Sequence, residues 1–320
     1  MLASIVIPAF NAASSVASAL YSVMRQTEQR FEVIVVDDCS VDETAAIVTD
    51  IARSDPRIKL ISLPKNVGPG AARNVAIDAA VGTWVALLDS DDRYHPCRLE
   101  RLLQMATRTD ADMVSDNIIL CPEGKAEPES IMYSRERIPC EMQLTATEFI
   151  IQNTKTGNGK RSGFVFMQPM LRRKFLLESG ARYDPGNRCG EDFMFYVQCL
   201  VRDASWWITP EPLYFYNIRH GSLTDRVTPG DLRAISALEQ ELLGRALTSS
   251  NAEFAAALRK HKRTVDHWRY TMAFKAALKR RDFAVAFDTA FESRSSFQSI
   301  LRDAAANAFL KVYRPYSRSG

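Results

Sequence analysis

Residues 84–92 read WVALLDSDD, an apolar run that passes directly into three carboxylates within four positions. An uninterrupted apolar run of this length is typical of a strand buried on both faces, as in the middle of a parallel sheet. Asp89 and Asp91 follow it two residues apart, so their side chains are expected on one face of the chain. Because like charges this close repel, the pair needs a cation. Carboxylates suit hard ions such as Mg²⁺ or Mn²⁺, which neutralise a diphosphate.

The same stretch has a second interpretation, in which its acids cap a helix. Ser and Asp are common at helix N-caps, and Pro96 marks a helix start a few residues later. One acid suits a cap well, but three acids in four positions suit it poorly. The stretch therefore favours a metal and nucleotide site.

Strand and helix patterns alternate on both sides of this stretch. Strands are predicted at residues 4–8, 31–36, 58–61, 84–88 and 111–119, with helical periodicity at 12–26, 42–51, 69–80 and 96–108. Such alternation builds βαβ units, in which helices cover both faces of a parallel sheet. We therefore predict an α/β fold with a Rossmann-like, mostly parallel sheet.

Polar residues terminate three of the predicted strands. Asn11, Asp38 and Asp89 each follow a different strand. Ligands bind beyond the carboxyl ends of strands in such sheets, so these side chains are expected in one crevice. The chain has no GxGxxG after its first strand and no GxxxxGK[ST], which disfavours a dinucleotide fold and a P-loop. A pyrophosphorylase would also need a Gly-rich loop there.

The second half of the pattern contains an acidic helix start. Short strands are predicted at residues 164–167, 206–208 and 213–216, the last two separated by prolines. Gly190 precedes a helix whose first turn holds Glu191 and Asp192, where the helix dipole stabilises negative charge. Dipole compensation alone would explain one acid. We expect Asp192 to be ionised at pH 7.

A polar loop is predicted after these strands. Residues 219–224 read RHGSLT, and Arg219, His220 and Ser222 would suit phosphate contact from a movable lid. An ordinary polar loop is the alternative interpretation.

Bulk composition describes a globular chain with uneven charge. The chain has 320 residues, 46% of them hydrophobic and 25% charged. Residues 1–230 hold 25 Lys/Arg and 29 Asp/Glu (net −4), whereas residues 231–320 hold 16 and 9 (net +7). The six cysteines lack metal-ligand spacing, which indicates free thiols in a reducing cytosol. No signal-peptide pattern and no membrane-length apolar run occur, so we expect a cytoplasmic protein that at most lies on a membrane.

Five blocks resemble the inverting glycosyltransferase family 2, whose members have the GT-A fold. They are IVIPAFN (5–11), VVDDCSVDET (35–44), NVGPGAARN (66–74), LLDSDD (87–92) and GED (190–192). Cys39 departs from the small residue that the family often has. The resemblance implies a catalytic domain at 1–228, with a nucleotide-binding half at 1–118 and an acceptor-side half and lid at 119–228. A basic helical extension at 229–320 resembles that of bacterial exopolysaccharide glycosyltransferases, including the succinoglycan type.

The resemblance also implies roles for individual residues. Asp38 would hydrogen-bond the uracil of a UDP-sugar, with Arg73 close to the nucleotide. Asp89 would lie by the ribose and the metal, and Asp91 would ligate Mn²⁺ or Mg²⁺ on the diphosphate. Asp192 would be the general base, with Glu191 the next candidate. The backbone near the uracil would come from Pro8, Ala9 and Phe10.

The sequence therefore predicts a metal-dependent inverting glycosyltransferase. On the exopolysaccharide resemblance it would move glucose from UDP-glucose to a saccharide acceptor, expected to be a lipid-linked oligosaccharide at the inner face of the cell membrane. The basic clusters at 259–263, 279–281 and 311–318 would attract anionic lipid. No nucleic-acid motif accompanies them. A non-catalytic nucleotide-binding module and a nucleotide-sugar pyrophosphorylase are the alternatives.

Overall fold

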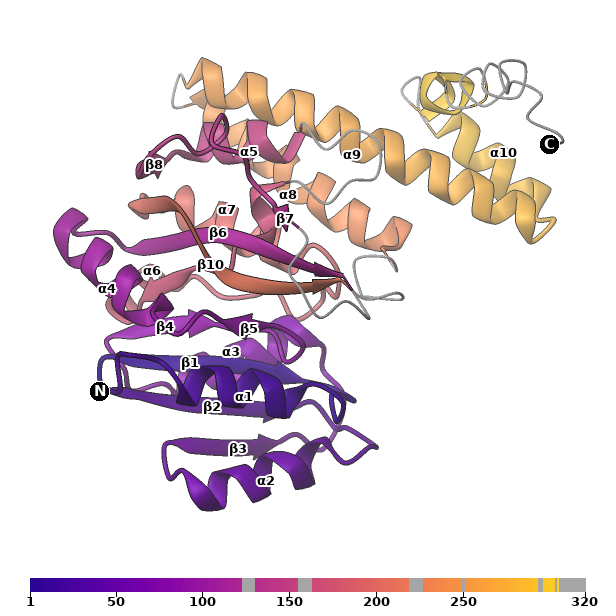
Figure 1. The fold of residues 1–320 in the computed structure, drawn as a ribbon. Helices are drawn as coiled ribbons and strands as arrows, with labels where there is room; N and C mark the ends of the chain where they lie inside the picture. Colours follow the sequence, from indigo (N-terminus) through magenta and orange to yellow (C-terminus); the bar gives the residue numbers. More distant parts are fainter. Residues whose placement is uncertain are drawn as a thin grey trace, which may run out of the picture. The chain divides into compact units, whose positions relative to one another are not determined.

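The chain forms two compact units, Met1–Asp225 and Arg226–Gly320. The computed structural model describes residues 1–122, 130–154, 163–218, 227–248, 251–292, 296–302 and 304. Figure 1 shows the strands and the covering helices of the first unit and the helices of the second.

Strands of the first unit join in one sheet. Within the described residues its order is β3-β2-β1-β4-β9-β6-β10-β5, with β7 paired to β6 and β8 to β10. The strands are β1 (Ala3–Ala9), β2 (Phe31–Asp37), β3 (Ile58–Ser62), β4 (Trp84–Leu87), β5 (Arg93–Tyr94), β6 (Met113–Pro122), β7 (Ser130–Ile131), β8 (Met142–Leu144), β9 (Met170–Arg172) and β10 (Trp206–Ile218). β1 and β2 are buried along their whole length, as expected for Val- and Ile-rich strands at the centre of an α/β fold.

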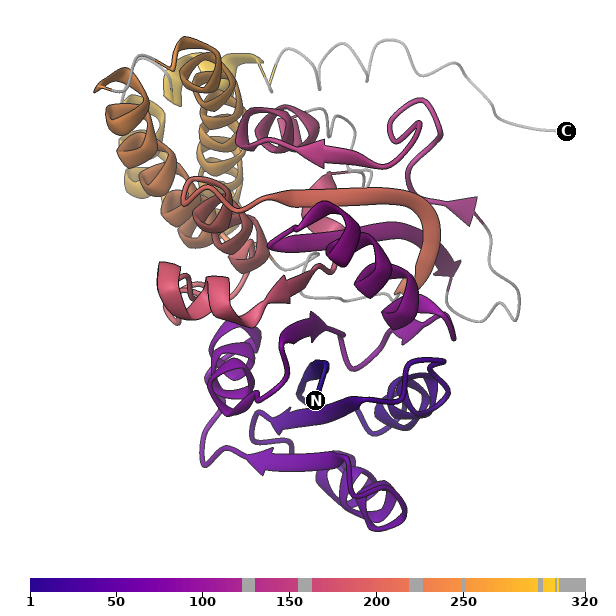
Figure 2. The same ribbon diagram turned by 90° about the vertical axis from the view of Figure 1, so that its left-hand side faces the viewer.

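Helices cover both faces of the parallel strands. The first unit contains α1 (Val16–Met24), α2 (Thr44–Ser54), α3 (Pro69–Ala79), α4 (Arg98–Thr109), α5 (Ala146–Thr154), α6 (Arg173–Ser179) and α7 (Glu191–Leu200). Figures 1 and 2 show α1 and α2 on one face of β1 to β3 and α3 on the other. The predicted α/β class is therefore confirmed.

The sheet is mixed rather than uniformly parallel. β1, β2, β3 and β4 pair in parallel, and β10 pairs in parallel with β6. β9 is antiparallel to both β4 and β6, and β5, β7 and β8 also pair antiparallel. The parallel half is the half that the alternating sequence pattern predicted.

Three predicted strands differ in the structure. Phe164–Phe166 forms a 3₁₀ turn, because Val165 N donates to Asn153 Oδ1 and Phe166 N to the Gly163 carbonyl instead of to a neighbouring strand. The two strands predicted at 206–208 and 213–216 are one strand, β10. Its register against β6 shifts on both sides of Pro212, and such an irregularity accommodates a residue without an N–H.

The parallel strands deliver polar residues to one edge of the sheet. Ala9 at the end of β1 lies opposite Asp37 at the end of β2, and Leu87 at the end of β4 lies opposite Val6. The residues that follow each strand therefore emerge at the same edge, where ligands bind in such folds.

The second unit is helical. It contains α8 (Pro229–Thr248), α9 (Ala252–Lys279) and α10 (Phe283–Phe291), with α8 and α10 both packed on α9. The side chains of Asn251 and Asp282 cap α9 and α10 by accepting from Phe254 N and Val285 N. His261 is a packing residue, since its ring pairs with buried Glu239. Among the helices described, none combines the length and apolar character needed to cross a bilayer.

Candidate active site

Arg73 of α3 lies at the centre of three carboxylates at the ligand edge of the sheet. Its Nη2 is 2.6 Å from Asp89 Oδ1, and its Nη1 is 3.1 Å from Glu191 Oε1 and 3.4 Å from Asp192 Oδ1. The Arg73 side chain is 4% exposed, so these charges meet in a largely desolvated place. Burial opposes the charge of Arg73, but Asp192 and Asp89 raise its pKa well above the ordinary value. The guanidinium therefore stays charged and links residues from α3, the end of β4 and α7.

Asp38 fixes the start of the helix that carries Arg73. Its two carboxylate oxygens accept hydrogen bonds from Val67 N (2.7 Å) and Gly68 N (2.8 Å). Gly68 has φ 91°, a left-handed conformation that glycine adopts without strain, and Pro69 then opens α3. The Asp38 carboxylate, which follows β2, thus positions the start of α3.

Asp192 and Glu191 enter the site through a tight turn. Gly190 precedes α7 with φ 75°, again in the left-handed region, so both acids lie in the first helical turn. The Asp192 side chain is 19% exposed and that of Glu191 10%. Glu191 accepts a hydrogen bond from Arg73, whereas the buried Oδ1 of Asp192 accepts none from the described residues. Asp192 is thus the more exposed of the two acids, and Arg73 donates its hydrogen bond to Glu191 instead.

Burial changes the protonation expected for Asp192. Burial raises its pKa to about 7, with Arg73 lowering it and the negative charges of Glu191 and Asp89 raising it further. The prediction that this acid is fully ionised at pH 7 is therefore wrong, because desolvation and like charges outweigh the helix dipole. A pKa near neutrality suits a general base.

The acidic stretch after β4 is fixed to β10. The Tyr214 hydroxyl donates to Asp92 Oδ2 (2.8 Å) and accepts from Asp89 N (3.2 Å). Asn217 donates its backbone N–H to Asp92 Oδ1 and its side-chain amide to the Asp91 carbonyl. Burial raises the pKa of Asp92 well above the usual range, with the Asp89 charge adding to the effect. Asp92 thus anchors this segment, and Asp91 remains partly exposed.

A second layer of polar residues supports Asp89. Gln168 Nε2 donates to Asp89 Oδ2 (3.2 Å), and the Gln168 carbonyl accepts from Arg98 Nη2. Arg98 is fully buried and pairs with Asp116 at 2.7 Å. Its guanidinium also lies 4.2 Å from the Tyr94 ring centre. No sequence pattern indicates a role for Gln168, a lone amide between apolar residues, or the anchoring role of Tyr214.

The chain that forms this site matches a known family. A profile described as Glycosyl transferase family 2 matches residues 4–176, more than half of the chain. The chain belongs to glycosyl transferase family 2. The matched residues include Asp38, Arg73, Asp89 and Asp91, and the chain is accordingly a glycosyltransferase.

Relatives and solved structures agree with this family. The succinoglycan biosynthesis protein ExoO of Rhizobium meliloti is 35% identical over 241 residues, covering 75% of this chain and 67% of ExoO. ExoU of the same organism is 30% identical over 298 residues, covering 93% and 85%. The crystal structure of S. aureus TarS 1–349 in complex with UDP-GlcNAc superposes with a TM-score of 0.61 at 19% identity, covering 91% and 92%. That likeness shows that the family 2 chain has the GT-A fold of TarS.

The carboxylates of this glycosyltransferase fit a metal ion that the phosphates of the substrate would help to hold. Among the residues described, no three His, Cys, Asp or Glu side chains form a metal-binding group. Mg²⁺ is commonly bound by one or two carboxylates plus substrate phosphates and water, and Asp91 and Asp89 supply that number. Asp91 is partly exposed next to Asp89, as such a shared site requires.

The structure brings together four of the residues predicted for this family 2 site. Asp89, Arg73, Glu191 and Asp192 form one cluster, and Asp38 fixes the helix of Arg73. At the end of β1, Pro8 and Ala9 are buried and Phe10 is 50% exposed. The predicted lid residues lie outside the described residues: Arg219, His220 and Ser222.

Proposed function

We propose that the protein is a metal-dependent inverting glycosyltransferase that moves a hexose from a UDP-sugar to a saccharide acceptor. The observation that carries this proposal is the position of Asp192, a partly exposed acid with a pKa near 7, 3.4 Å from the Arg73 that also binds Asp89. The buried Arg73 guanidinium thereby connects the acceptor-side base, Asp192, to the donor-side carboxylate, Asp89.

On the donor side, the nucleotide lies at the sheet edge formed by β1, β2 and β4. The TarS structures, which share the fold, hold UDP-GlcNAc or UDP, and this supports a UDP-sugar donor. Asp38 and the backbone of Pro8, Ala9 and Phe10 hold the uracil, and Arg73 keeps Asp89 oriented toward the ribose. Asp91 and Asp89 would hold Mn²⁺ or Mg²⁺. The ion, when bound, neutralises the charge that develops on the departing UDP.

On the acceptor side, Asp192 removes the proton of the acceptor hydroxyl as its oxygen attacks the anomeric carbon. The bond from that carbon to UDP breaks on the opposite face, so the configuration inverts. Asp192 is more exposed than Glu191, and Arg73 donates its hydrogen bond to Glu191 while it pairs with Asp192 only at 3.4 Å, which supports Asp192 as the base. Glu191 is the second candidate for the base.

The names of the relatives ExoO and ExoU support a role in exopolysaccharide biosynthesis. Within that role, we propose glucose as the transferred sugar and a lipid-linked oligosaccharide as the acceptor. Such an acceptor places the enzyme in the cytoplasm at the inner face of the cell membrane, as a peripheral protein.

Donor turnover tests the proposal directly. The full chain is incubated with Mn²⁺ and UDP-glucose, UDP-galactose or UDP-N-acetylglucosamine, and released UDP is measured alongside binding by isothermal titration. We expect UDP-glucose to be turned over fastest. Preference for another donor would refute glucose but not the mechanism, whereas absence of turnover and of UDP binding would refute the proposal. Formation of pyrophosphate from a nucleoside triphosphate and a sugar phosphate would instead indicate a pyrophosphorylase.

A further inference from the structure

Aromatic side chains gather on one side of α10 and the short helical segment after it. Phe283, Phe287 and Phe291 recur every four residues and are 68%, 64% and 58% exposed. The ring centres of Phe287 and Phe291 are 4.6 Å apart, and that of Phe297 lies 5.4 Å from Phe291. These four phenylalanines are called the aromatic face. Single exposed apolar residues are ordinary, but a contiguous aromatic group indicates an interaction surface.

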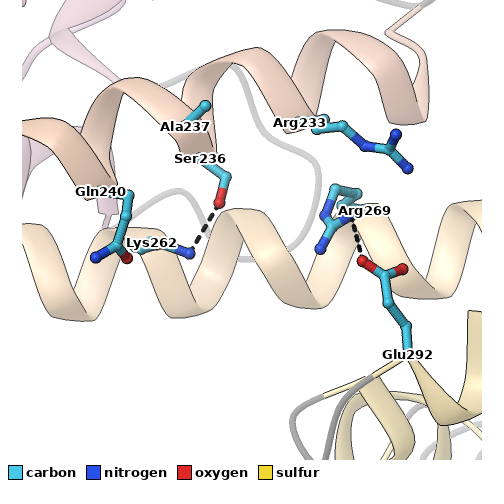
Figure 3. Close-up of a pocket in the computed structure, with 7 residues that line it drawn as sticks. All are labelled: Arg233, Ser236, Ala237, Gln240, Lys262, Arg269 and Glu292. Carbon is cyan, nitrogen blue, oxygen red and sulfur yellow. Dashed lines mark hydrogen bonds and ion pairs between the residues drawn. The ribbon is translucent and has the colours of Figure 1, made fainter.

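A neighbouring side of α10 is held on α9. Ala286 and Ala290 are buried, and Glu292 pairs with Arg269 of α9 at 3.2 Å. Figure 3 shows this ion pair at a cavity of about 450 Å³ that is lined by residues from the two long helices and by Glu292. Turning the aromatic face inward would break the ion pair and expose both alanines. The phenylalanines are therefore presented to the surroundings by the packing of the unit.

A basic turn leads into this face. Lys279, Arg280 and Arg281 are all exposed and connect α9 to α10. Asp282 caps α10, and Glu292 pairs with Arg269, so two of the nearby acids are engaged within the unit. Asp288 is exposed on the side of α10 opposite Ala286 and Ala290.

We propose that the aromatic face and the basic turn together bind the surface of an anionic lipid bilayer. Phenylalanine on an amphipathic helix enters the boundary between headgroups and acyl chains, and neighbouring Lys and Arg attract anionic lipid phosphates. Charge favours this occupant over a second copy of the chain. A parallel two-fold pairing of the aromatic faces would bring two copies of the basic turn close together, where like charges repel, whereas an anionic bilayer meets the turn with opposite charge. The inference deepens the proposed function, since it rests on an acceptor carried by a lipid.

Vesicle sedimentation of the full chain tests the surface. We expect binding to vesicles of phosphatidylcholine with phosphatidylglycerol, much weaker binding to phosphatidylcholine alone, and release in high salt. Replacing Lys279, Arg280 and Arg281 with Gln should weaken binding on the order of 100-fold, since each basic residue near the surface contributes roughly fivefold. Phe287→Ser with Phe291→Ser should weaken binding at least ~10-fold.

Matched variants in the first unit serve as controls. Leu177 is 54% exposed, and Leu177→Ser removes an apolar side chain without touching the aromatic face. Arg53, Arg101 and Lys174 are exposed, and their replacement by Gln removes three charges elsewhere. Both controls should bind vesicles like the unmodified chain. All variants should release UDP from a UDP-sugar at unchanged rates. Absence of UDP release from every protein, the unmodified chain included, would count against the proposed function and not against the membrane surface.

Two outcomes would overturn the inference. One is equal binding, or none, to neutral and anionic vesicles. The other is unchanged vesicle binding by the Phe287 and Phe291 variant together with reduced self-association in sedimentation velocity. That result would assign the aromatic face to contact between copies of the chain.

Discussion

Arg73 Nη2 donates to Asp89 Oδ1 at 2.6 Å, and through this contact one buried guanidinium connects the end of β4 to the first turn of α7. The other terminal nitrogen of Arg73 bonds Glu191 and lies near Asp192. Three carboxylates can share this buried space because the guanidinium offsets their repulsion. Arg73 therefore positions the acids of both halves of the site.

Removal of this cation should destabilise the first unit. Arg73→Met leaves three partly buried carboxylates without their cation, and breaking a buried ion pair in this way costs about 3–5 kcal/mol of the free energy of unfolding. Arg73→Lys keeps the charge but lacks the planar fork that reaches Asp89 and Glu191 together, so its loss should be smaller. Urea unfolding measures both. Arg53→Met breaks an exposed ion pair and is the control. Equal unfolding of the Arg73→Met and Arg53→Met proteins would contradict the buried role.

Asp192→Asn should abolish most transfer while leaving the donor site intact. The amide retains the shape of the carboxylate but cannot accept a proton, so kcat should fall by roughly two to four orders of magnitude. UDP affinity, measured by isothermal titration, should change little. Glu191→Gln is the matched variant, because it alters the adjacent acid. If Glu191→Gln loses the activity and Asp192→Asn stays within a few-fold of the unmodified enzyme, the base is Glu191.

The pH dependence of the reaction should report the raised pKa of Asp192. Its ionised form is the base, and its pKa is about 7, so kcat/KM should rise with pH up to about 7 and then level off. The sign for stability is opposite. In the folded protein Asp192 keeps its proton at pH values above 3.8, the pKa of an ordinary Asp, and releases it near pH 7. This group therefore makes the fold less stable as the pH rises from 3.8 to about 7. Asp192→Asn should remove both effects in rate profiles and thermal melts. An unchanged melting profile would contradict the assigned pKa.

Chelation should stop transfer reversibly. If Asp91 and Asp89 share an ion with the diphosphate, EDTA should abolish UDP release, and added Mn²⁺ or Mg²⁺ should restore it. Asp91→Asn should weaken Mn²⁺-dependent UDP binding in titration and keep the fold by circular dichroism. Full turnover in EDTA would rule out the metal role. Asp112 forms a half-buried ion pair with Arg172 outside the site, and Asp112→Asn is the control with the same change of side chain.

Periodicity predicted the parallel half of the fold because each short buried strand there is followed by one amphipathic helix. β1, β2 and β4 end at one edge, so the polar residues that follow them could be placed together from the sequence. The same reasoning failed for Phe164–Phe166, where Asn153 and Gly163 satisfy the backbone locally. A side chain that bonds the backbone from twelve residues away leaves no periodic signal.

The protonation and support of the site were also beyond sequence reasoning. The helix dipole at α7 is visible in the sequence, but the burial that raises the pKa of Asp192 depends on how Arg73, Glu191 and Asp89 converge. Gln168 contacts Asp89 across 79 positions of the chain. Such contacts are set by tertiary packing, which no local pattern encodes.

Gln168 provides a final test, because its side chain supports Asp89 without bearing a charge. Gln168→Leu removes the 3.2 Å hydrogen bond to Asp89, and one such bond contributes about 0.5–1.5 kcal/mol to stability. The fold should therefore persist, while a less oriented Asp89 raises the donor KM and the Mn²⁺ concentration needed for activity.

Gln26 offers the matched control for this change. It is also buried, and it bonds the backbone of His95 and Leu99 instead of a site acid. Gln26→Leu should lower the melting temperature and leave the donor KM unchanged. Steady-state kinetics at varied UDP-sugar and Mn²⁺, with thermal melts, separate the two variants. If Gln168→Leu behaves like Gln26→Leu in every measurement, Gln168 is a packing residue and Asp89 is oriented by Arg73 alone.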